Sequence, residues 1–184
     1  MADDLDSAVD DFQPQVGDAV FATTRTFYGF LIRLGQALRW WKWRRWNHMA
    51  IIVRIDADGT IWCLQMVKEC SMVRLEDLTK KGIIKIVTAP EGVNRDEAVA
   101  YAMKQLGTDY GVLTIVSIAV NLLLPRFINI DIRRGGTLIC SALVARSWEH
   151  GSWDCGRVDP FQITPAEMDK FLNDEGHLVN IKIV

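Results

Sequence analysis

Two stretches decide the fold: NHMAIIV at residues 47–53 and LICSALV at residues 138–144. The first is a short apolar run typical of a buried strand, and it begins at His48. The second is typical of the start of a helix, with Cys140 in its first turn. A helix N-terminus and a nearby imidazole both favour a thiolate, so the pair predicts a thiol of lowered pKa beside a proton acceptor. The histidine precedes the cysteine by most of a domain. This is the reverse of the common order, in which the cysteine comes first in the chain.

The composition is that of an ordinary folded domain. Of the 184 residues, 49% are hydrophobic and 24% are charged, which is enough apolar material for a true core. The formal net charge of −2 argues against general nucleic-acid binding. We expect one domain at residues 14–184, preceded by an acidic flexible arm at residues 1–13.

The cysteines form neither a CxxC pair nor a metal-ligand spacing with the three histidines. The sequence therefore predicts reduced thiols, no metal and no cofactor, in keeping with synthesis in the cytoplasm. The four cysteines are Cys63, Cys70, Cys140 and Cys155.

Neither a signal peptide nor a transmembrane segment is expected. The N-terminus is acidic and lacks the basic and apolar regions of a signal peptide. The longest apolar stretch, residues 112–124, is too short to span a bilayer. If the protein acts outside its cell of origin, another carrier must deliver it.

Apolar periodicity and turn residues predict an α+β domain with no internal repeat. The cap signals for two of the helices are Asn94 followed by Glu97, and Thr164 followed by Glu167. The expected strands are 19–22, 49–55, 61–67, 82–87 and 178–184, and the expected helices are 24–41, 94–106, 112–124, 140–150 and a short one from Thr164.

Five short motifs in this order resemble the permuted NlpC/P60-like papain-fold proteins, from about Gly17 to Met168. They are GDAVF at 17–21, WNHMAII at 46–52, GTDY at 107–110, ICSALV at 139–144 and ITPAEM at 163–168. The resemblance implies a circularly permuted papain-like fold, with a central antiparallel sheet or half-barrel and the cysteine helix packed on it. It also implies Cys140 as the nucleophile, His48 as the base and Tyr110 near the substrate.

The third member of the expected site is Gln65, where the family usually has Glu. A hairpin turning at residues 56–59 brings Gln65 close to a position opposite His48, so its amide oxygen could accept a ring N–H and fix the tautomer. A neutral partner stabilises an imidazolium less than a carboxylate does. A second departure is Ala142, where the family motif usually carries Glu.

The segment at residues 39–46, here called the Trp/Arg segment, has two interpretations. Its tryptophans could cap the core while its cations are solvated. Alternatively, it could hold a sugar-peptide or lipid substrate, because Trp faces stack on sugars and Arg attracts anionic groups. The substrate-binding candidates in it are Trp43, Arg44, Arg45 and Trp46.

The resemblance implies a cysteine hydrolase that cleaves an amide bond, with a cell-wall (peptidoglycan) peptide as the leading substrate. Two alternatives stay open: a lipid acyltransferase or esterase of the same fold, and a non-enzymatic binding or structural part of a larger assembly such as a phage tail. A wall-active fold without a signal peptide also fits delivery to the wall as part of a particle.

Overall fold

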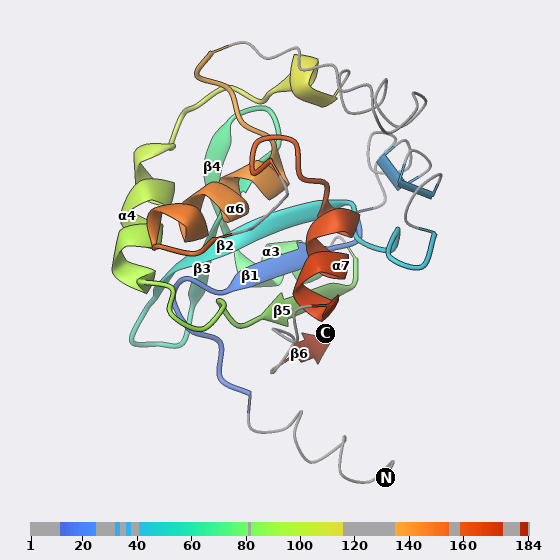
Figure 1. The fold of residues 1–184 in the computed structure, drawn as a ribbon. Coiled ribbons are helices and arrows are strands. Elements are labelled where there is room, and N and C mark those ends of the chain that lie inside the picture. Colours follow the sequence, from blue (N-terminus) through green and yellow to red (C-terminus); the bar gives the residue numbers. More distant parts are fainter. Residues whose placement is uncertain are drawn as a thin grey trace, which may run out of the picture.

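A six-stranded antiparallel sheet forms the centre of the molecule, with the spatial order β4-β3-β2-β1-β5-β6 (Figure 1). The strands are β1 (Ala19–Ala22), β2 (His48–Ile55), β3 (Ile61–Met66), β4 (Cys70–Arg74), β5 (Ile84–Val87) and β6 (Ile181–Ile183). This computed structural model describes residues 12–24, 32–33, 36–37, 41–80, 82–115, 135–154, 159–174 and 181–183.

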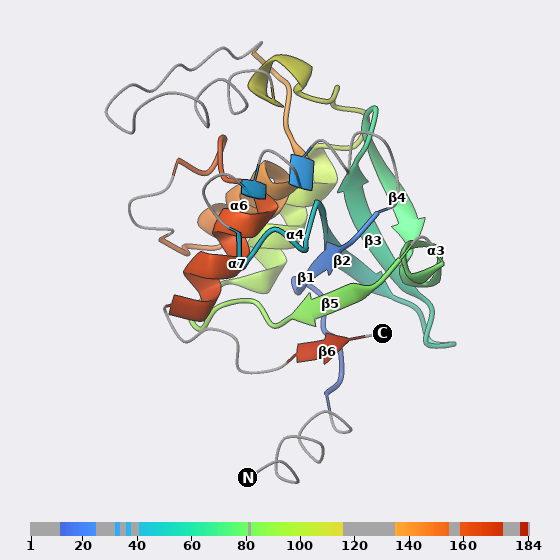
Figure 2. The ribbon, with the colours of Figure 1, turned by 90° about the vertical axis from the view of Figure 1, so that its right-hand side faces the viewer.

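Helices cover both faces of the sheet, and the larger layer lies on one side (Figure 2). That layer contains α4 (Arg95–Lys104), α6 (Cys140–His150) and α7 (Pro165–Asp174), while α3 (Leu75–Thr79) lies on the opposite side. Helix α6 packs on both β2 and α4, so its first residue lies against the centre of the sheet. The architecture is therefore α+β, as the sequence predicts.

Alternation along the strands divides the core into two clusters. Met49 and Ile51 of β2 pack with α4, α6 and α7, whereas Ala50 and Ile52 pack with Leu78 of α3 on the other face. Successive side chains of a strand point to opposite faces, so a sheet covered on both faces gives an uninterrupted apolar run. This is the physical reason for the unbroken run that begins at Met49.

The β2–β3 hairpin places the two sequence-predicted polar residues at the same end of the sheet. Its ladder runs from Ala50 opposite Gln65 to Ile55 opposite Ile61, with an irregularity between Ile52 and Arg54. His48 therefore lies two residues from the partner of Gln65, as the turn at residues 56–59 predicts.

Most of the expected elements within the described residues are confirmed, including both helix caps. The Asn94 side chain accepts a hydrogen bond from the Glu97 N–H at 3.2 Å, and the Thr164 hydroxyl accepts one from the Glu167 N–H at 3.1 Å. The expected helices at 24–41 and 112–124 lie largely outside the described residues. Their described parts at 32–33, 36–37 and 112–115 are helical, and residues 41–45 form turns.

The structure adds two elements that the sequence did not predict and corrects the placement of Phe12. Strand β4 and helix α3 were not predicted, because their half-buried residues show neither a clear alternation nor a cap signal. Phe12 does not belong to a loose arm: only 7% of it is exposed, and it packs in the α3-side cluster.

No helix within the described ranges is long and apolar enough to cross a membrane.

A buried ion pair joins the sheet to α7. Lys85 of β5 and Asp169 of α7 form this pair, and each side chain is 6% exposed. Burial is the main influence on both groups: it lowers the pKa of the Lys85 ammonium and raises the pKa of the Asp169 carboxyl. The ammonium also lies 4.6 Å from the ring centre of Phe21. Desolvation thus offsets much of the attraction between the two charges.

We predict that breaking this pair from one side destabilises the protein more than removing both charges. Lys85→Met or Asp169→Leu alone leaves one buried charge without its counterion and should lower the free energy of unfolding by about 3–5 kcal/mol. The double variant should recover most of that loss, because no buried charge remains. Denaturant unfolding of the three variants measures this. A double variant as unstable as the sum of the two singles would show no energetic coupling between the two charges and would contradict this account of the pair.

Candidate functional site

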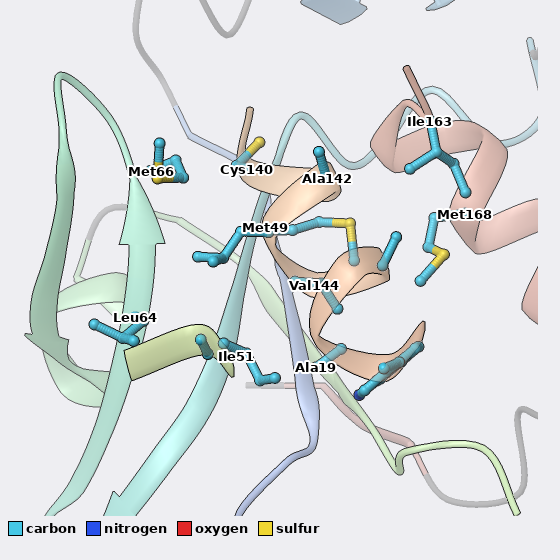
Figure 3. Close-up of a cluster of buried hydrophobic side chains, with 14 of the residues drawn as sticks. Ala19, Met49, Ile51, Leu64, Met66, Cys140, Ala142, Val144, Ile163 and Met168 are labelled. Atoms are coloured by element: carbon cyan, nitrogen blue, oxygen red, sulfur yellow. The ribbon is translucent and has the colours of Figure 1, made fainter. Parts of the chain in front are cut away.

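Cys140 is the first residue of α6 and lies at the junction of that helix with the sheet. Ile139 is the N-cap, in extended conformation, and Cys140 itself is 3% exposed. In Figure 3 it stands at the start of the helix, near Met49 and Met66 of the two neighbouring strands. The backbone N–H groups of Met49, Cys140 and Ser141 donate toward its sulfur. Three convergent N–H groups can stabilise negative charge that develops at this position.

The resting thiol nevertheless has a raised pKa, which corrects the sequence expectation. Burial raises the pKa of Cys140 above its ordinary value, and this effect exceeds the lowering by the N–H groups and by the Tyr110 hydroxyl. The thiol is therefore protonated at neutral pH. A nucleophile of this kind needs a base that removes its proton as it reacts.

His48 and Gln65 form the second part of the site. The Nε2 atom of His48 lies 2.9 Å from Oε1 of Gln65, and both residues are buried. An amide oxygen can only accept a hydrogen bond, so this contact requires a proton on Nε2, and in the neutral ring Nδ1 is then the basic nitrogen. The contact that the hairpin register predicts is present. The catalytic roles of the two residues remain predictions.

Strand β2 connects the two parts of the site. His48 bonds to Gln65, and the next residue, Met49, directs its N–H at the Cys140 sulfur. Met49 lies one residue beyond the first pair of the β2–β3 ladder, at the end of the hairpin remote from the turn. His48, the first residue of β2, thus contacts Gln65, and Met49, the second, contacts the thiol of Cys140.

Tyr110 is positioned beside the thiol by a short bridge. Its backbone pairs with Leu138, two residues before Cys140, and its N–H donates to the Lys68 carbonyl at 3.0 Å. The Tyr110 hydroxyl hydrogen-bonds with Cys140, and burial together with the thiolate charge raises the pKa of the phenol well above its ordinary value. Tyr110 therefore remains a donor throughout the physiological pH range. The sequence placed Tyr110 near the substrate, but it carried no signal for this contact or for the Met49 N–H.

The Trp/Arg segment is divided between core and surface. Trp46 is 4% exposed, contacts Phe21 edge-on and belongs to the core, as the core-capping interpretation of the segment expects, and its role in substrate binding stays a prediction. Trp41 is 65% exposed, and the Arg44 guanidinium lies 3.3 Å from its ring centre. Trp43 is half-buried and Arg45 is exposed. Among the candidates here, Trp43, Arg44 and Arg45 remain accessible.

The structure accounts for Ala142, where the family that the motifs resemble usually carries Glu. Ala142 is fully buried between α6 and the segment containing Ile163 and Met168 (Figure 3). A glutamate side chain at this position would place a charge in an apolar core, which is costly without a partner.

Comparisons with known proteins establish the fold but no family. No family model matches the sequence, and no curated protein matches it either. Among solved structures, the chain is similar to the crystal structure of the metalloprotein yiiX from Escherichia coli O157:H7, a DUF1105 protein. The TM-score is 0.57 at 15% identity, with 94% of this chain and 89% of that chain covered.

The neighbour's description as a metalloprotein raises the question of a metal in this chain. Across the described ranges, no group of three His, Cys, Asp or Glu side chains is placed to hold an ion. A site built from His48, Gln65, Cys140 and Tyr110 has two of the usual metal donors, the imidazole and the thiol. Within the described part of the chain, this donor set does not fit a resident metal.

We predict that Cys140 reacts with iodoacetamide before Cys63 and Cys70 in the folded protein at neutral pH. Burial raises the pKa of Cys63 to about 12 and that of Cys70 to about 11. Only about 10⁻⁵ and 10⁻⁴ of these thiols are then ionised at pH 7. The pKa of Cys140 is raised as well, but the base that the sequence predicts for it, His48, is the residue before Met49, whose N–H is directed at the Cys140 sulfur. Mass spectrometry after limited labelling identifies the first site, and a fully unfolded sample gives the intrinsic order. Earlier labelling of Cys63 or Cys70 would remove Cys140 as the nucleophile.

A second prediction concerns the neutral partner of His48. Gln65→Ala removes the acceptor for Nε2–H and should slow Cys140 alkylation about tenfold, a part of the 10²–10⁴-fold typical of a whole general base. Gln65→Glu should preserve or raise the rate, because a carboxylate stabilises the imidazolium. The rate is measured against pH in all three proteins, with circular dichroism as the control for folding. Identical profiles would mean that Gln65 only packs.

Proposed function

We propose that the protein is a cysteine hydrolase that cleaves an amide bond, with Cys140 as nucleophile, His48 as base and Gln65 as the residue that orients the base. The observation that carries this proposal is the convergence at the start of β2. His48 is hydrogen-bonded to Gln65, and the adjacent Met49 N–H is directed at the Cys140 sulfur. A base oriented by a third group, next to a nucleophile at a helix start, is the general arrangement of covalent amide hydrolysis.

The reaction begins from a neutral pair. His48 Nδ1 removes the Cys140 proton while the sulfur attacks the carbonyl carbon, forming a C–S bond and a tetrahedral oxyanion. The C–N bond then breaks, and the imidazolium gives its proton to the leaving amine, which leaves a thioester on Cys140. Water attacks the thioester with His48 again as base. The products are the carboxylic acid and the regenerated thiol.

Tyr110 and the backbone N–H groups have a role in stabilising charge. The Tyr110 hydroxyl donates toward the thiol in the resting state, and its high pKa keeps it protonated while negative charge develops. Donors fixed in a site that excludes water are worth far more than in bulk solvent. In this proposal, Tyr110 and the N–H groups at the start of α6 stabilise the thiolate and then the oxyanion.

The proposed fold family is the permuted papain-like group that the five motifs resemble. The histidine strand preceding the cysteine helix, and the packing of α6 on β2, support this assignment. A peptidoglycan peptide is then the leading substrate, and delivery to the wall as part of a particle is the corresponding route. The half-buried Arg44 and the exposed Arg45 are suited to anionic groups of such a substrate.

Lipid-ester hydrolysis or acyl transfer is the second candidate, and a specific observation favours it. Val112, Leu113 and Val67 are exposed, at 63%, 47% and 53%. Val112 follows Tyr110 by two residues, and the Tyr110 N–H bonds to Lys68, the neighbour of Val67. Exposed aliphatic side chains on the two segments joined at Tyr110 are suited to an acyl chain. A binding or structural role without catalysis remains the third candidate, supported by the neutral Gln65.

We predict that Cys140→Ala abolishes hydrolysis, whereas Cys70→Ala, which removes another buried thiol, leaves it largely intact. Wild-type protein is incubated in parallel with purified peptidoglycan peptides and with a short-chain thioester or phospholipid. Mass spectrometry measures released fragments and any acyl adduct on Cys140. Cleavage of peptides supports the leading substrate, and adducts from the acyl donor alone support the second. Absence of products and adducts with all substrates would contradict the enzyme proposal and favour a binding role.

A further inference from the structure

The two residues before His48 are both anchored by side-chain hydrogen bonds. The Asn47 carboxamide accepts from the Thr24 N–H at 2.8 Å and donates to the Thr24 carbonyl at 2.9 Å. The Trp46 carbonyl accepts from Gln36 Nε2 at 2.9 Å, and the Trp46 indole donates to the Asp169 carboxylate. The chain that leads into His48 is therefore fixed on both its backbone and its side chains.

Helix α7 supplies the anchors of Trp46. Gln36, whose amide N donates to Trp46, accepts at Oε1 from the Ala166 N–H in the first turn of α7, at 2.8 Å. Asp169 lies one turn further along the same helix. It bonds to the Trp46 indole, and its ion pair with Lys85 holds the carboxylate in place. Trp46 is thus linked to α7 at two points, one through its backbone and one through its ring.

The residues that lead into α7 also hold the cysteine helix. Ser141, next to Cys140, is fully buried and donates its hydroxyl to the Ile163 carbonyl at 2.5 Å. Ile163 and Met168 pack against α6 in the same cluster (Figure 3). One segment, residues 163–169, therefore contacts the residue after the nucleophile and the residue two before the base.

From these contacts we propose that residues 163–169, here called the α7 clamp, position the Cys140 helix against the His48 strand, with Asp169 and Ser141 as positioning residues. The proposal rests on the proposed function, since it needs Cys140 and His48 to act together. An ion pair whose burial costs much of its attraction adds little to stability, but it fixes one arrangement of Trp46. Small displacements between a nucleophile and its base reduce rates strongly, so such fixing has a direct kinetic effect.

The test compares two double variants. Both lack the charges of Lys85 and Asp169, but only one keeps a hydrogen-bond acceptor for the Trp46 indole. Lys85→Met/Asp169→Leu has no acceptor for Trp46, whereas Lys85→Met/Asp169→Asn retains an amide oxygen. Cys140 alkylation by iodoacetamide is measured against pH for both, each with His48 intact and with His48→Ala. We expect the Leu variant to react about tenfold more slowly than the Asn variant, and this difference to vanish when His48 is absent. If Asp169 acted only in folding, the rate difference between the Leu and Asn variants would persist in the His48→Ala proteins.

The Ser141 contact is tested separately, with a control on the same helix. Ser141→Ala removes the bond to Ile163, and Ser147→Ala removes an equally buried hydroxyl that donates to the Leu143 carbonyl within α6, at 2.7 Å. Ser141→Ala should slow alkylation in a His48-dependent manner, and Ser147→Ala should not. This arm keeps the proposal testable if a Lys85/Asp169 variant fails to fold.

The outcomes separate the clamp from the proposed function. Equal rates for the Leu and Asn variants, or for the two serine variants, overturn the clamp while a slow His48→Ala protein keeps the base assignment. If His48→Ala alone reacts as fast as wild type, the base assignment itself fails and the positioning role fails with it.

Discussion

The first turn of α6 lies directly on the start of β2, and the rest of the site depends on this contact. The Met49 N–H is directed at the Cys140 sulfur, which sets the height of the helix above the sheet. Since His48 is the residue before Met49, the same contact holds the thiol next to the strand position that follows the imidazole. Gln65 then fixes the imidazole from the neighbouring strand. A helix start seated on a central strand is thus enough to bring together residues far apart in the sequence.

Burial determines the protonation state of the Cys140 thiol in the absence of substrate. The helix start and the N–H groups favour a thiolate, but desolvation of the sulfur is larger and raises the pKa of Cys140. Gln65 offers the imidazolium a dipole and no charge. Burial thus favours a neutral thiol at rest, and Gln65 adds no negative charge that would hold His48 as an imidazolium. The proposed reaction therefore depends on proton transfer during attack, and less on a preformed ion pair.

Local sequence signals predicted the elements that form the site. The apolar run after His48, the turn at residues 56–59 and the caps at Asn94 and Thr164 give β2, the hairpin, α4 and α7, because each is encoded within a few residues. The register of the hairpin also predicted the approach of Gln65 to His48. These features need no knowledge of distant contacts.

Long-range packing produced the features that the sequence did not predict. The raised pKa of Cys140 comes from atoms of several elements, and the contact of Tyr110 arises from its bridge with Leu138. For Trp46 the sequence left a core role and a substrate-binding role open, and the structure shows it buried against Phe21 and bonded to Asp169. In each case the environment is set by a segment distant in the sequence, and no local pattern records it.

The tautomer and charge of His48 test the central claim most directly. Nitrogen-15 NMR of the imidazole at neutral pH distinguishes a protonated from an unprotonated ring nitrogen. The account predicts a neutral ring with the proton on Nε2, and a change in the Nδ1 signal when Cys140 is alkylated. An imidazolium at neutral pH, a proton on Nδ1, or a signal unaffected by alkylation would contradict it.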